Sequence, residues 1–301
     1  TYTSDISSAA SDVYKRQHLD GVSQRWEEHS EQRRELAAQI AVLKLYRERL
    51  QSSRNRLEAQ LARHWPELPG VLDLGSVTLM SLVASYGSPA QVAAHAEAAR
   101  QLMQRSGRSG LRQEKIEGVI EAARYTLGMP CLEAERVLLQ TLAQDMLDNH
   151  RAVQQAEQAL AAQVDADATL RWLASVVGKT TAAVLVSTQG SPQEYPDAGS
   201  YLKSLGLNLK ERSSGKFQGQ LKITKRGPGI ARLYLYFAAL RWLYRDPIIQ
   251  AWYQRKVARD GGCKGKAIVA IMRKLAKALW YVAQGVAFDS RKLFNRKALA
   301  A

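Results

Sequence analysis

The feature that most restricts the fold of this chain is a leucine repeat with a period of seven residues. It lies in a polar segment, Ser23 to His64, that contains no glycine, and its members are Leu36, Leu43, Leu50 and Leu57. Such a repeat predicts a long helix with a coiled-coil stripe on one face. Pro66, Pro69 and Gly70 follow directly and predict its end.

The stripe is interrupted by charge. Ile40 and Leu61 occupy the complementary seam, but Arg47 and Arg54 stand where that seam requires apolar residues. Packing against a second helix is therefore favoured over a strict two-stranded zipper.

A second long amphipathic stretch runs from Leu132 to Val164, after shorter helical patterns between Val71 and Gly128. Together the two long stretches predict an antiparallel helical hairpin that carries a small helical cap. This arm would act as a spacer or as an oligomerisation arm. We expect a homo-oligomer, with residues 18–164 sedimenting as a dimer or larger, whereas a monomer would favour an intramolecular hairpin.

Positive charge is concentrated in the last third of the chain. Residues 203–301 hold 22 Lys and Arg against four Asp and Glu, which leaves the rest of this +15 protein slightly acidic. A block of this kind predicts binding to a polyanion, because each neutralised phosphate releases condensed counterions. The expected partner is nucleic acid. An oligomeric scaffold built on the long helices would leave the block unexplained.

The remaining composition excludes several classes of protein. No apolar run approaches the ~18 residues of a membrane span. Cys131 and Cys263 lie far apart, and the five His residues form no zinc pattern. We therefore expect a cytoplasmic protein without membrane association and with no cofactor in this chain.

The chain divides into three predicted parts. Residues 1–17 contain Asp12-Val13-Tyr14-Lys15-Arg16-Gln17, which looks like a translated sequencing adapter, so we expect an artefactual leader. Residues 18–164 form the helical coiled-coil arm and cap, and residues 165–301 form a basic helical domain. The predicted fold class is all-α.

A glycine-containing turn at Gly178-Lys179-Thr180 joins two short helical patterns between Leu170 and Val186. Helix-hairpin-helix turns can direct backbone N–H groups and a lysine, here Lys179, at a phosphate. An ordinary αα-hairpin whose Gly178 only permits a tight turn explains the residues equally well.

A second loop combines hydroxyl groups, glycine and cations, in the order Arg212-Ser213-Ser214-Gly215-Lys216. Glycine lets a backbone approach a phosphate closely, and the cations stabilise its charge. A serine here could bind a phosphate or attack it, but attack needs an activating base or metal. Because no His-Asp pair lies nearby in sequence, the residues alone favour a phosphate-binding loop.

Two further helices are predicted in the basic block. The first follows Gly227-Pro228, with an apolar stripe expected to face the core and made of Ile230, Leu233, Phe237, Leu240 and Tyr244. Arg232, Tyr234, Arg241 and Arg245 lie partly off this stripe and could face nucleic acid, with tyrosine as a possible stacking surface. The second helix, from Gly265 to Gln284, is expected to bury Ile268, Ile271, Met272, Leu275 and Leu279 while presenting Arg273, Lys274 and Lys277.

Several motifs in one order resemble the transposase domain of the IS-one-ten insertion-sequence family, which is related to Piv-type DNA invertases. The resemblance covers about Leu170 to Leu293, and the long-helix region resembles the family's coiled-coil segment. The motifs are Leu173-Ala174-Ser175-Val176-Val177-Gly178 with Thr181-Ala182-Ala183, Tyr201-Leu202-Lys203-Ser204-Leu205-Gly206-Leu207, Ser213-Ser214-Gly215-Lys216, Ile223-Thr224-Lys225-Arg226-Gly227 and Ala231-Arg232.

The resemblance implies a recombinase that joins double-stranded DNA through a serine, guided by a structured bridge RNA. The family serine falls on Ser214, with the adjacent Ser213 as the alternative. Divalent metal, Mg²⁺, is expected in an N-terminal RuvC-like domain. We expect this sequence to be an N-terminally truncated piece without that domain, and the fragment alone to be inactive. The nucleic-acid contacts would come from Lys179, Arg212, Lys216, Lys222, Lys225, Arg226 and Arg232. Val177 departs from the family's usual proline.

One alternative function remains open. The same residues could form a non-catalytic helix-hairpin-helix module that binds DNA or RNA, in which the serine loop only holds a phosphate backbone.

Overall fold

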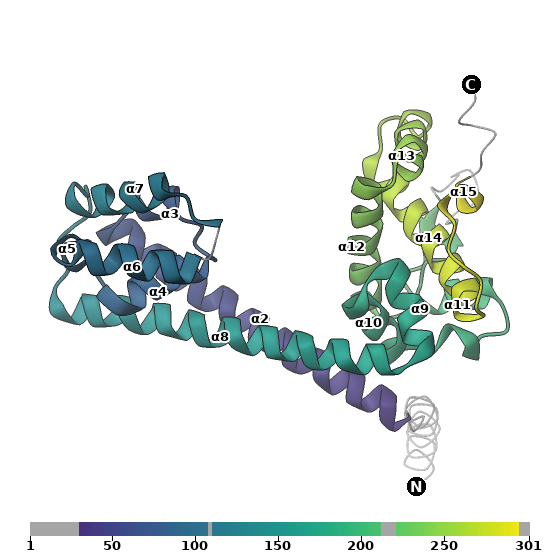
Figure 1. Cartoon of the computed structure of the whole chain (residues 1–301). Coiled ribbons are helices and arrows are strands. Elements are labelled where there is room, and N and C mark those ends of the chain that lie inside the picture. The colour runs from purple at the N-terminus through teal and green to yellow at the C-terminus, as the bar shows by residue number, and fades with distance from the viewer. Residues whose placement is uncertain (1–29, 108–109, 212–220, 295–301) are drawn as a thin grey trace, which may run out of the picture. The chain divides into compact units, whose positions relative to one another are not determined.

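Residues 30–107, 110–211 and 221–294 are described by the structure, a computed structural model (Figure 1). The chain forms two units. The second unit is Gln39–Ala174, and the first takes the chain before and after it. The predicted all-α class is confirmed, because all described elements are helical apart from one pair of two-residue strands. The predicted domain ranges stay predictions.

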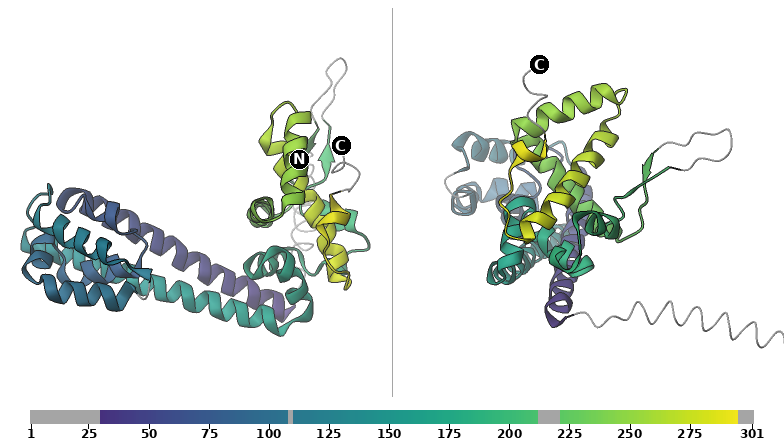
Figure 2. Two further views of the ribbon diagram at one scale, coloured as in Figure 1. Left: turned by 45° about the horizontal axis from the view of Figure 1, so that its top comes forward. Right: turned by 90° about the vertical axis from the view of Figure 1, so that its right-hand side faces the viewer.

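Two long helices form the body of the second unit. They are α2 (Glu31–His64), which begins in the first unit, and α8 (Glu133–Ala166). The views agree that they run side by side in opposite directions (Figures 1 and 2). An ion pair joins Arg47 to Glu157 at 2.5 Å. Arg47, which interrupts the predicted seam, is therefore matched by a carboxylate on the neighbouring helix.

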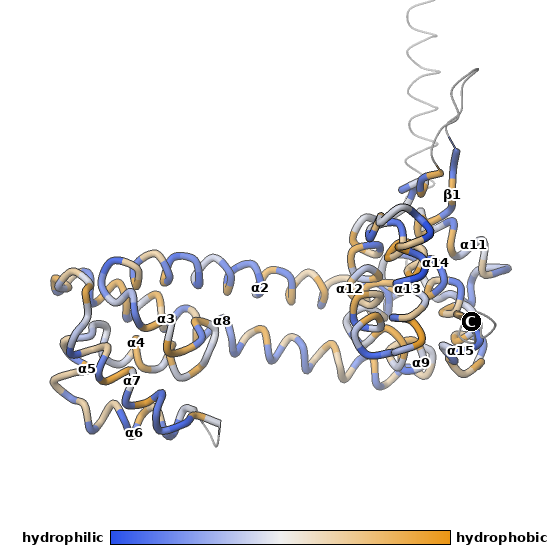
Figure 3. The backbone as a smooth tube through the Cα atoms, turned by 90° about the horizontal axis from the view of Figure 1, so that it is seen from above, coloured by the Kyte–Doolittle hydropathy of each residue, from blue (hydrophilic) through white to orange (hydrophobic). Residues whose placement is uncertain are grey.

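The leucine repeat is buried within the chain. Leu43 and Leu57 are 1% and 0% exposed, and Leu50 packs partly buried against the main apolar cluster. Along α2 and α8, hydrophilic and hydrophobic stretches alternate (Figure 3), as expected for helices with one buried face. The repeat therefore accounts for packing inside one chain.

Five short helices form the cap at one end of the long pair. They are α3 (Leu68–Val71), α4 (Val77–Tyr86), α5 (Pro89–Ala94), α6 (Ala96–Gly107) and α7 (Gln113–Arg124). Ser76 and Ser88 start α4 and α5 by accepting hydrogen bonds from backbone N–H groups three residues later. The shared core includes Leu57 and Leu61 from α2, Trp65 directly after it, Leu79, Met80, Leu82, Met103, Val119 and Ile120 from the cap, and Leu139 and Met146 from α8.

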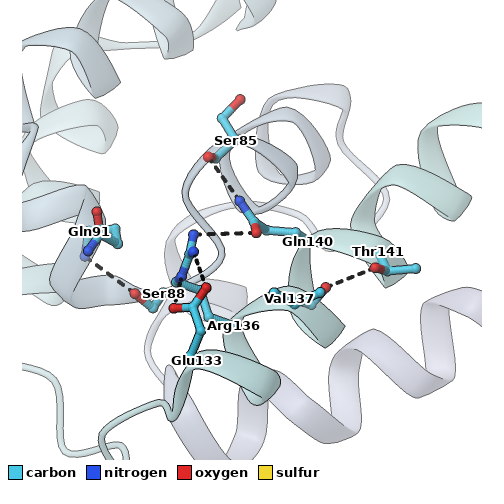
Figure 4. A network of polar contacts seen from close by, with 8 residues as sticks. All are labelled: Ser85, Ser88, Gln91, Glu133, Arg136, Val137, Gln140 and Thr141. Atoms are coloured by element: carbon cyan, nitrogen blue, oxygen red, sulfur yellow. Dashed lines mark hydrogen bonds and ion pairs between the residues drawn. The ribbon is translucent and has the colours of Figure 1, made fainter.

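A glycine lets α4 approach α8 closely. Gly87 ends α4 at φ +68°, where a Cβ atom would lie 2.7 Å from the carbonyl oxygen of Arg136. Beside it, the Gln140 side-chain amide donates to the carbonyl oxygen of Ser85 at 3.2 Å (Figure 4). The same view shows Arg136 paired with Glu133 on the first turn of α8.

The first unit packs around helix α14 (Lys264–Ala283). This helix contacts α11 (Ala198–Ser204), α12 (Gly229–Arg245), α13 (Pro247–Arg259) and the short η2 (Pro192–Glu194). Its buried residues include the predicted Ile271, Met272, Leu275 and Leu279, whereas Ile268 is only partly buried. The unit also contains α10 (Lys179–Gln189) and α15 (Ser290–Leu293), while α9 (Ala168–Val177) crosses into it.

The predicted core face of α12 is wrong. Leu233, Phe237 and Tyr244 are 50%, 52% and 84% exposed. The helix instead buries the opposite face, formed by Ala231, Leu235, Ala238 and Ala239. Because alanine side chains are small, this face allows close packing of helix backbones, which a search for large apolar residues does not detect.

Within the described ranges, no helix is both long enough and apolar enough to cross a membrane.

Candidate nucleic-acid interface

A short ribbon of two strands marks the site. β1 (Leu209–Lys210) pairs antiparallel with β2 (Lys222–Ile223), so that Leu209 faces Ile223 and Lys210 faces Lys222. The chain between the strands contains the predicted loop. Its members Arg212, Ser213, Ser214 and Lys216 lie outside the described residues.

Two glycines bring the motif segments at 201–207 and 223–227 into backbone contact. A Cβ atom on Gly206 would lie 2.4 Å from the carbonyl oxygen of Arg226, and one on Gly227 would lie 2.2 Å from that of Ser204. Between them Lys225 has φ +55°, and its N–H donates to the carbonyl oxygen of Gly206 at 2.9 Å. A left-handed conformation is uncommon for lysine. The close approach therefore fixes the backbone from which Lys225 and Arg226 project.

Two arginines hold this junction through backbone carbonyl groups. Arg232 donates to the carbonyl oxygens of Leu205 at 3.2 Å and Gly227 at 2.9 Å, which connects the two segments. Arg273, on α14, donates to the carbonyl oxygen of Leu207 at 2.9 Å, and partial burial lowers the pKa of its guanidinium. The ribbon is thereby anchored to α12 and α14.

An open groove of about 1490 Å³ lies between the ribbon, residues 224–226 and helices α13 and α14. Its lining contains one carboxylate, Asp260, whose pKa is lowered chiefly by a hydrogen bond from Lys256. Seven cations line the same groove, namely Lys210, Lys222, Lys225, Arg226, Lys256, Lys266 and Arg273. Its lining also includes apolar side chains, among them Ile223 and Val269. A strongly cationic groove of this kind attracts a phosphate backbone.

The structure brings together three of the predicted contact residues, Lys222, Lys225 and Arg226, which all line the groove. Sequence reasoning missed Lys210, Lys256 and Lys266 as members of this site. The excess of Lys and Arg over residues 203–301 includes these three lysines, but no local sequence motif distinguishes them from the other cations of that block. Arg232 has two carbonyl partners, and its contact with nucleic acid stays a prediction.

The Gly178 turn is held by α12. Gly178 lies between α9 and α10 at φ +82°, directly under the guanidinium group of Arg241. Trp242 Nε1 donates to the carbonyl oxygen of Val176 at 2.7 Å, and Arg241 donates to that of Val177. These contacts account for a glycine at position 178 without any bound phosphate. Lys179 is exposed at the start of α10 and does not line the groove.

Lys274 is not presented to solvent as predicted. Its Nζ donates to the carbonyl oxygen of Leu293 at 2.7 Å and lies over the rings of Trp252 and Phe294. Burial, with a smaller effect from Lys277, lowers its pKa. Lys274 therefore contributes to packing, whereas Lys277 is exposed as expected.

Part of the region that forms this interface matches a known family. Residues 174–254 match the family model described as Transposase IS116/IS110/IS902 family, which includes both motif segments and β2. The comparison supports the IS110 transposase family. A relative from Streptomyces coelicolor (strain ATCC BAA-471 / A3(2) / M145), described as "Insertion element IS110 uncharacterized 43.6 kDa protein", is 26% identical over 273 residues. The alignment covers 85% of this chain and 66% of that relative, so the chain spans just under two thirds of its length.

The described residues contain no group of three or more His, Cys, Asp or Glu side chains that could hold a metal ion. They do not fit the divalent metal site that the family resemblance implies. That site stays a prediction for another domain.

Proposed function

We propose that this chain is part of a DNA transposase that exchanges DNA strands, and that its cationic groove holds nucleic-acid phosphates next to a reactive serine. The observation that supports this most directly is the construction of the groove. Gly206, Lys225 and Gly227 all have positive φ and lie in the segments that match the family model. Their close backbone contacts position the side of the groove that carries Lys222, Lys225 and Arg226.

Ser214 is the proposed nucleophile, with Ser213 as the neighbouring alternative. Both belong to the chain that connects β1 to β2, and both strands line the groove. In the proposed step the serine Oγ forms a bond to a phosphodiester phosphorus. The bond from that phosphorus to one bridging oxygen of the DNA strand breaks, the released strand end takes a proton as a hydroxyl group, and the serine proton passes to a base. Attack by that hydroxyl on the phosphoserine reverses the step and rejoins DNA.

Groove cations have a defined part in this step. They would bind the nonbridging phosphate oxygens and stabilise the charge that develops during attack. Lys222 and Lys225 are exposed on the ribbon side of the groove, and Lys266 lines the groove from α14. A backbone held between these two sides would be fixed near the serine loop, which reduces the entropy cost of reaction.

Structured guide RNA is the second proposed polyanion, because a groove that binds phosphates does not by itself distinguish RNA from DNA. The proposal therefore includes double-stranded DNA and a bridge RNA as partners. Divalent metal, when bound in the implied additional domain, would supply Lewis-acid stabilisation. The alternative function, a binding module without catalysis, uses the same groove and differs only at the serine.

Salt dependence tests the groove. Affinity of the whole chain for duplex DNA should fall steeply with rising salt. Lys222→Ala or Lys225→Ala should each reduce the slope of log affinity against log salt by about 0.9, the value for one lost phosphate contact. Lys277→Ala removes the same charge from an exposed site outside the groove and should leave the slope nearly unchanged. Equal effects of all three substitutions would show that the groove is not the binding site.

Loss of the covalent intermediate tests the serine. In a version that also carries the proposed metal-binding domain, Ser214→Ala should bind nucleic acid almost normally, because one neutral hydroxyl contributes only ~1 kcal/mol. The same variant should neither recombine DNA nor form a protein–DNA adduct on denaturing gels, while Ser213→Ala should retain the adduct. An adduct from Ser214→Ala would refute the assignment, and its loss only in Ser213→Ala would move the nucleophile to Ser213. Normal binding with no adduct in the parent protein would favour the non-catalytic module.

A further inference from the structure

Phosphate binding does not explain the apolar part of the groove in the first unit. Five aliphatic side chains, named here the aliphatic lining, lie in the groove together with its cations: Leu209, Leu221, Ile223, Val269 and Ala270. Phosphate oxygens need hydrogen-bond donors or positive charge, and contact with aliphatic carbon supplies neither. The aliphatic lining therefore indicates a ligand that has an apolar part as well as an anionic part.

The ribbon supplies three of these side chains on one of its faces. Leu209 lies directly opposite Ile223 in the antiparallel pair, so their side chains project from the same face. Leu221 lies two residues before Ile223 and shares that face, because successive residues of an extended segment alternate. Leu221 is 54% exposed, and Leu209 and Ile223 are only partly buried. Since all three line the groove, the ribbon turns an accessible apolar face toward it.

Helix α14 supplies the other two side chains. Val269 and Ala270 follow Lys266 by one turn and precede Arg273 by one turn, and all four line the groove. The helix buries a different face, which includes Ala267, Ile271 and Leu275. Val269 and Ala270 are only partly buried, so they stay accessible to a ligand.

Hydrogen bonds hold the two sides of the aliphatic lining in place. Arg273 on α14 donates to the carbonyl oxygen of Leu207, two residues before Leu209, at 2.9 Å. Thr224 N donates to the carbonyl oxygen of Asn208 at 2.8 Å, directly beside the pair of Leu209 and Ile223. The lining is thus formed before a ligand binds, which reduces the entropy cost of binding.

We propose that the aliphatic lining receives the base of an unpaired nucleotide, while the groove cations bind the phosphates next to it. A nucleotide combines an anionic phosphate with a base whose flat faces become accessible once the base leaves a helix. The carboxylate in the lining, Asp260, is paired with Lys256 at 2.5 Å, so the groove keeps a large excess of positive charge. An anionic ligand is therefore favoured over a neutral apolar one.

This inference rests on the proposed function, which supplies the polyanion, and adds the state of the nucleotide. Aliphatic side chains contact the face of a base, not its hydrogen-bonding edge, so the identity of the base should matter little. DNA and RNA share this chemistry. Taking a base out of a duplex costs free energy, and the cost is lowest where the base is already unpaired. The groove should therefore prefer a bulged or single-stranded nucleotide over a fully paired duplex.

Two bulged duplexes test the base site on the unmodified whole chain. One carries a single bulged nucleotide, and the other carries an abasic residue at the same bulge, so both have the same number of phosphates. The bulge with a base should bind at least about fivefold more tightly, the low end of what contact with one base contributes. Equal affinities in both DNA and RNA versions would overturn the inference. A preference in only one of them would identify that nucleic acid as the source of the nucleotide.

Leu221→Ser with Val269→Ser removes one aliphatic side chain from each side of the groove and leaves every charge in place. The variant should lose the preference for the bulge with a base and keep the parent slope of log affinity against log salt. Both residues are accessible, so the variant should fold, which far-UV circular dichroism checks. A preference that survives in this variant would overturn the assignment to the aliphatic lining.

Leu233→Ser with Phe237→Ser is the matched control, because it removes two exposed apolar side chains from α12, outside the groove. It should keep both the preference and the slope, and loss of the preference only in this control would move the base site to α12. Failure of the proposed function gives a different result. Binding that ignores salt would refute the groove as a phosphate site, whereas salt-dependent binding with equal affinity for the two bulges would refute the base site alone.

Discussion

Replacing Gly206 with alanine should weaken the first unit through two separable costs. The first is conformational, because Gly206 has φ +68° and the left-handed region costs an L-residue about 1–2 kcal/mol. The second is steric. The new methyl group would lie 2.4 Å from the carbonyl oxygen of Arg226 and 2.8 Å from its carbonyl carbon and amide nitrogen. These are backbone atoms, which cannot rotate away, so the segment carrying Lys225 and Arg226 must move. Overpacking of this kind costs about 1–3 kcal/mol.

Gly261→Ala isolates the conformational part. Gly261 has nearly the same backbone angle, φ +65°, but an added Cβ atom would meet nothing within 4 Å. We expect Gly206→Ala to reduce the free energy of unfolding by about 2–5 kcal/mol and Gly261→Ala by about 1–2 kcal/mol. Urea unfolding followed by tryptophan fluorescence measures both, since Trp242, Trp252 and Trp280 belong to this unit.

DNA affinity supplies a second measurement. Because Gly206→Ala displaces the wall that carries Lys225 and Arg226, its affinity for DNA should fall, whereas Gly261→Ala should keep the parent affinity. Equal destabilisation by the two alanines would refute the close backbone approach as the origin of this geometry.

Three further changes have defined outcomes. Gly178→Ala should cost no more than about 1 kcal/mol beyond Gly262→Ala in urea unfolding. Both glycines have φ +82°, and the contact at Gly178 is the movable end of Arg241. The pKa of Asp197 is lowered by hydrogen bonds from the Ser200 hydroxyl and from the N–H groups of Ser200 and Gly199, so its stabilisation is complete above the unfolded pKa near 4 and is lost as pH falls through the folded value. Asp197→Asn should therefore show a smaller drop in thermal midpoint between pH 6 and about pH 2 than the parent. Lys274→Ala should lower the urea midpoint more than Lys277→Ala, because only Lys274 packs on Trp252 and Phe294 and bonds to a backbone carbonyl.

Helix content and the all-α class follow from periodicity and from breakers such as Pro66 and Gly178, because these signals are local. The choice of face on α12 does not follow. Both faces of this helix are apolar, and only tertiary packing shows that Ala231, Leu235 and Ala238 are inside while Leu233 and Phe237 are outside. Periodicity identifies an apolar stripe but does not say what covers it.

The candidate site was predictable to the extent that its residues are neighbours in sequence. Lys222, Lys225 and Arg226 belong to one cationic motif, so their place in one groove follows from the sequence. Lys256 and Lys266 reach the same groove only because α13 and α14 fold back beside the ribbon. Arg273, predicted to be presented to solvent, is partly buried and donates a hydrogen bond to the carbonyl oxygen of Leu207.

Cys263 gives the groove a chemical reporter. This exposed thiol precedes α14 and lines the groove, whereas Cys131 is half-buried and its pKa is raised by burial and by Glu135. Since the thiolate is the reactive form, a thiol-directed label should modify Cys263 first. Occupancy of the groove can then be followed on the unmutated protein as slower labelling of a single cysteine, independently of any assay for strand exchange.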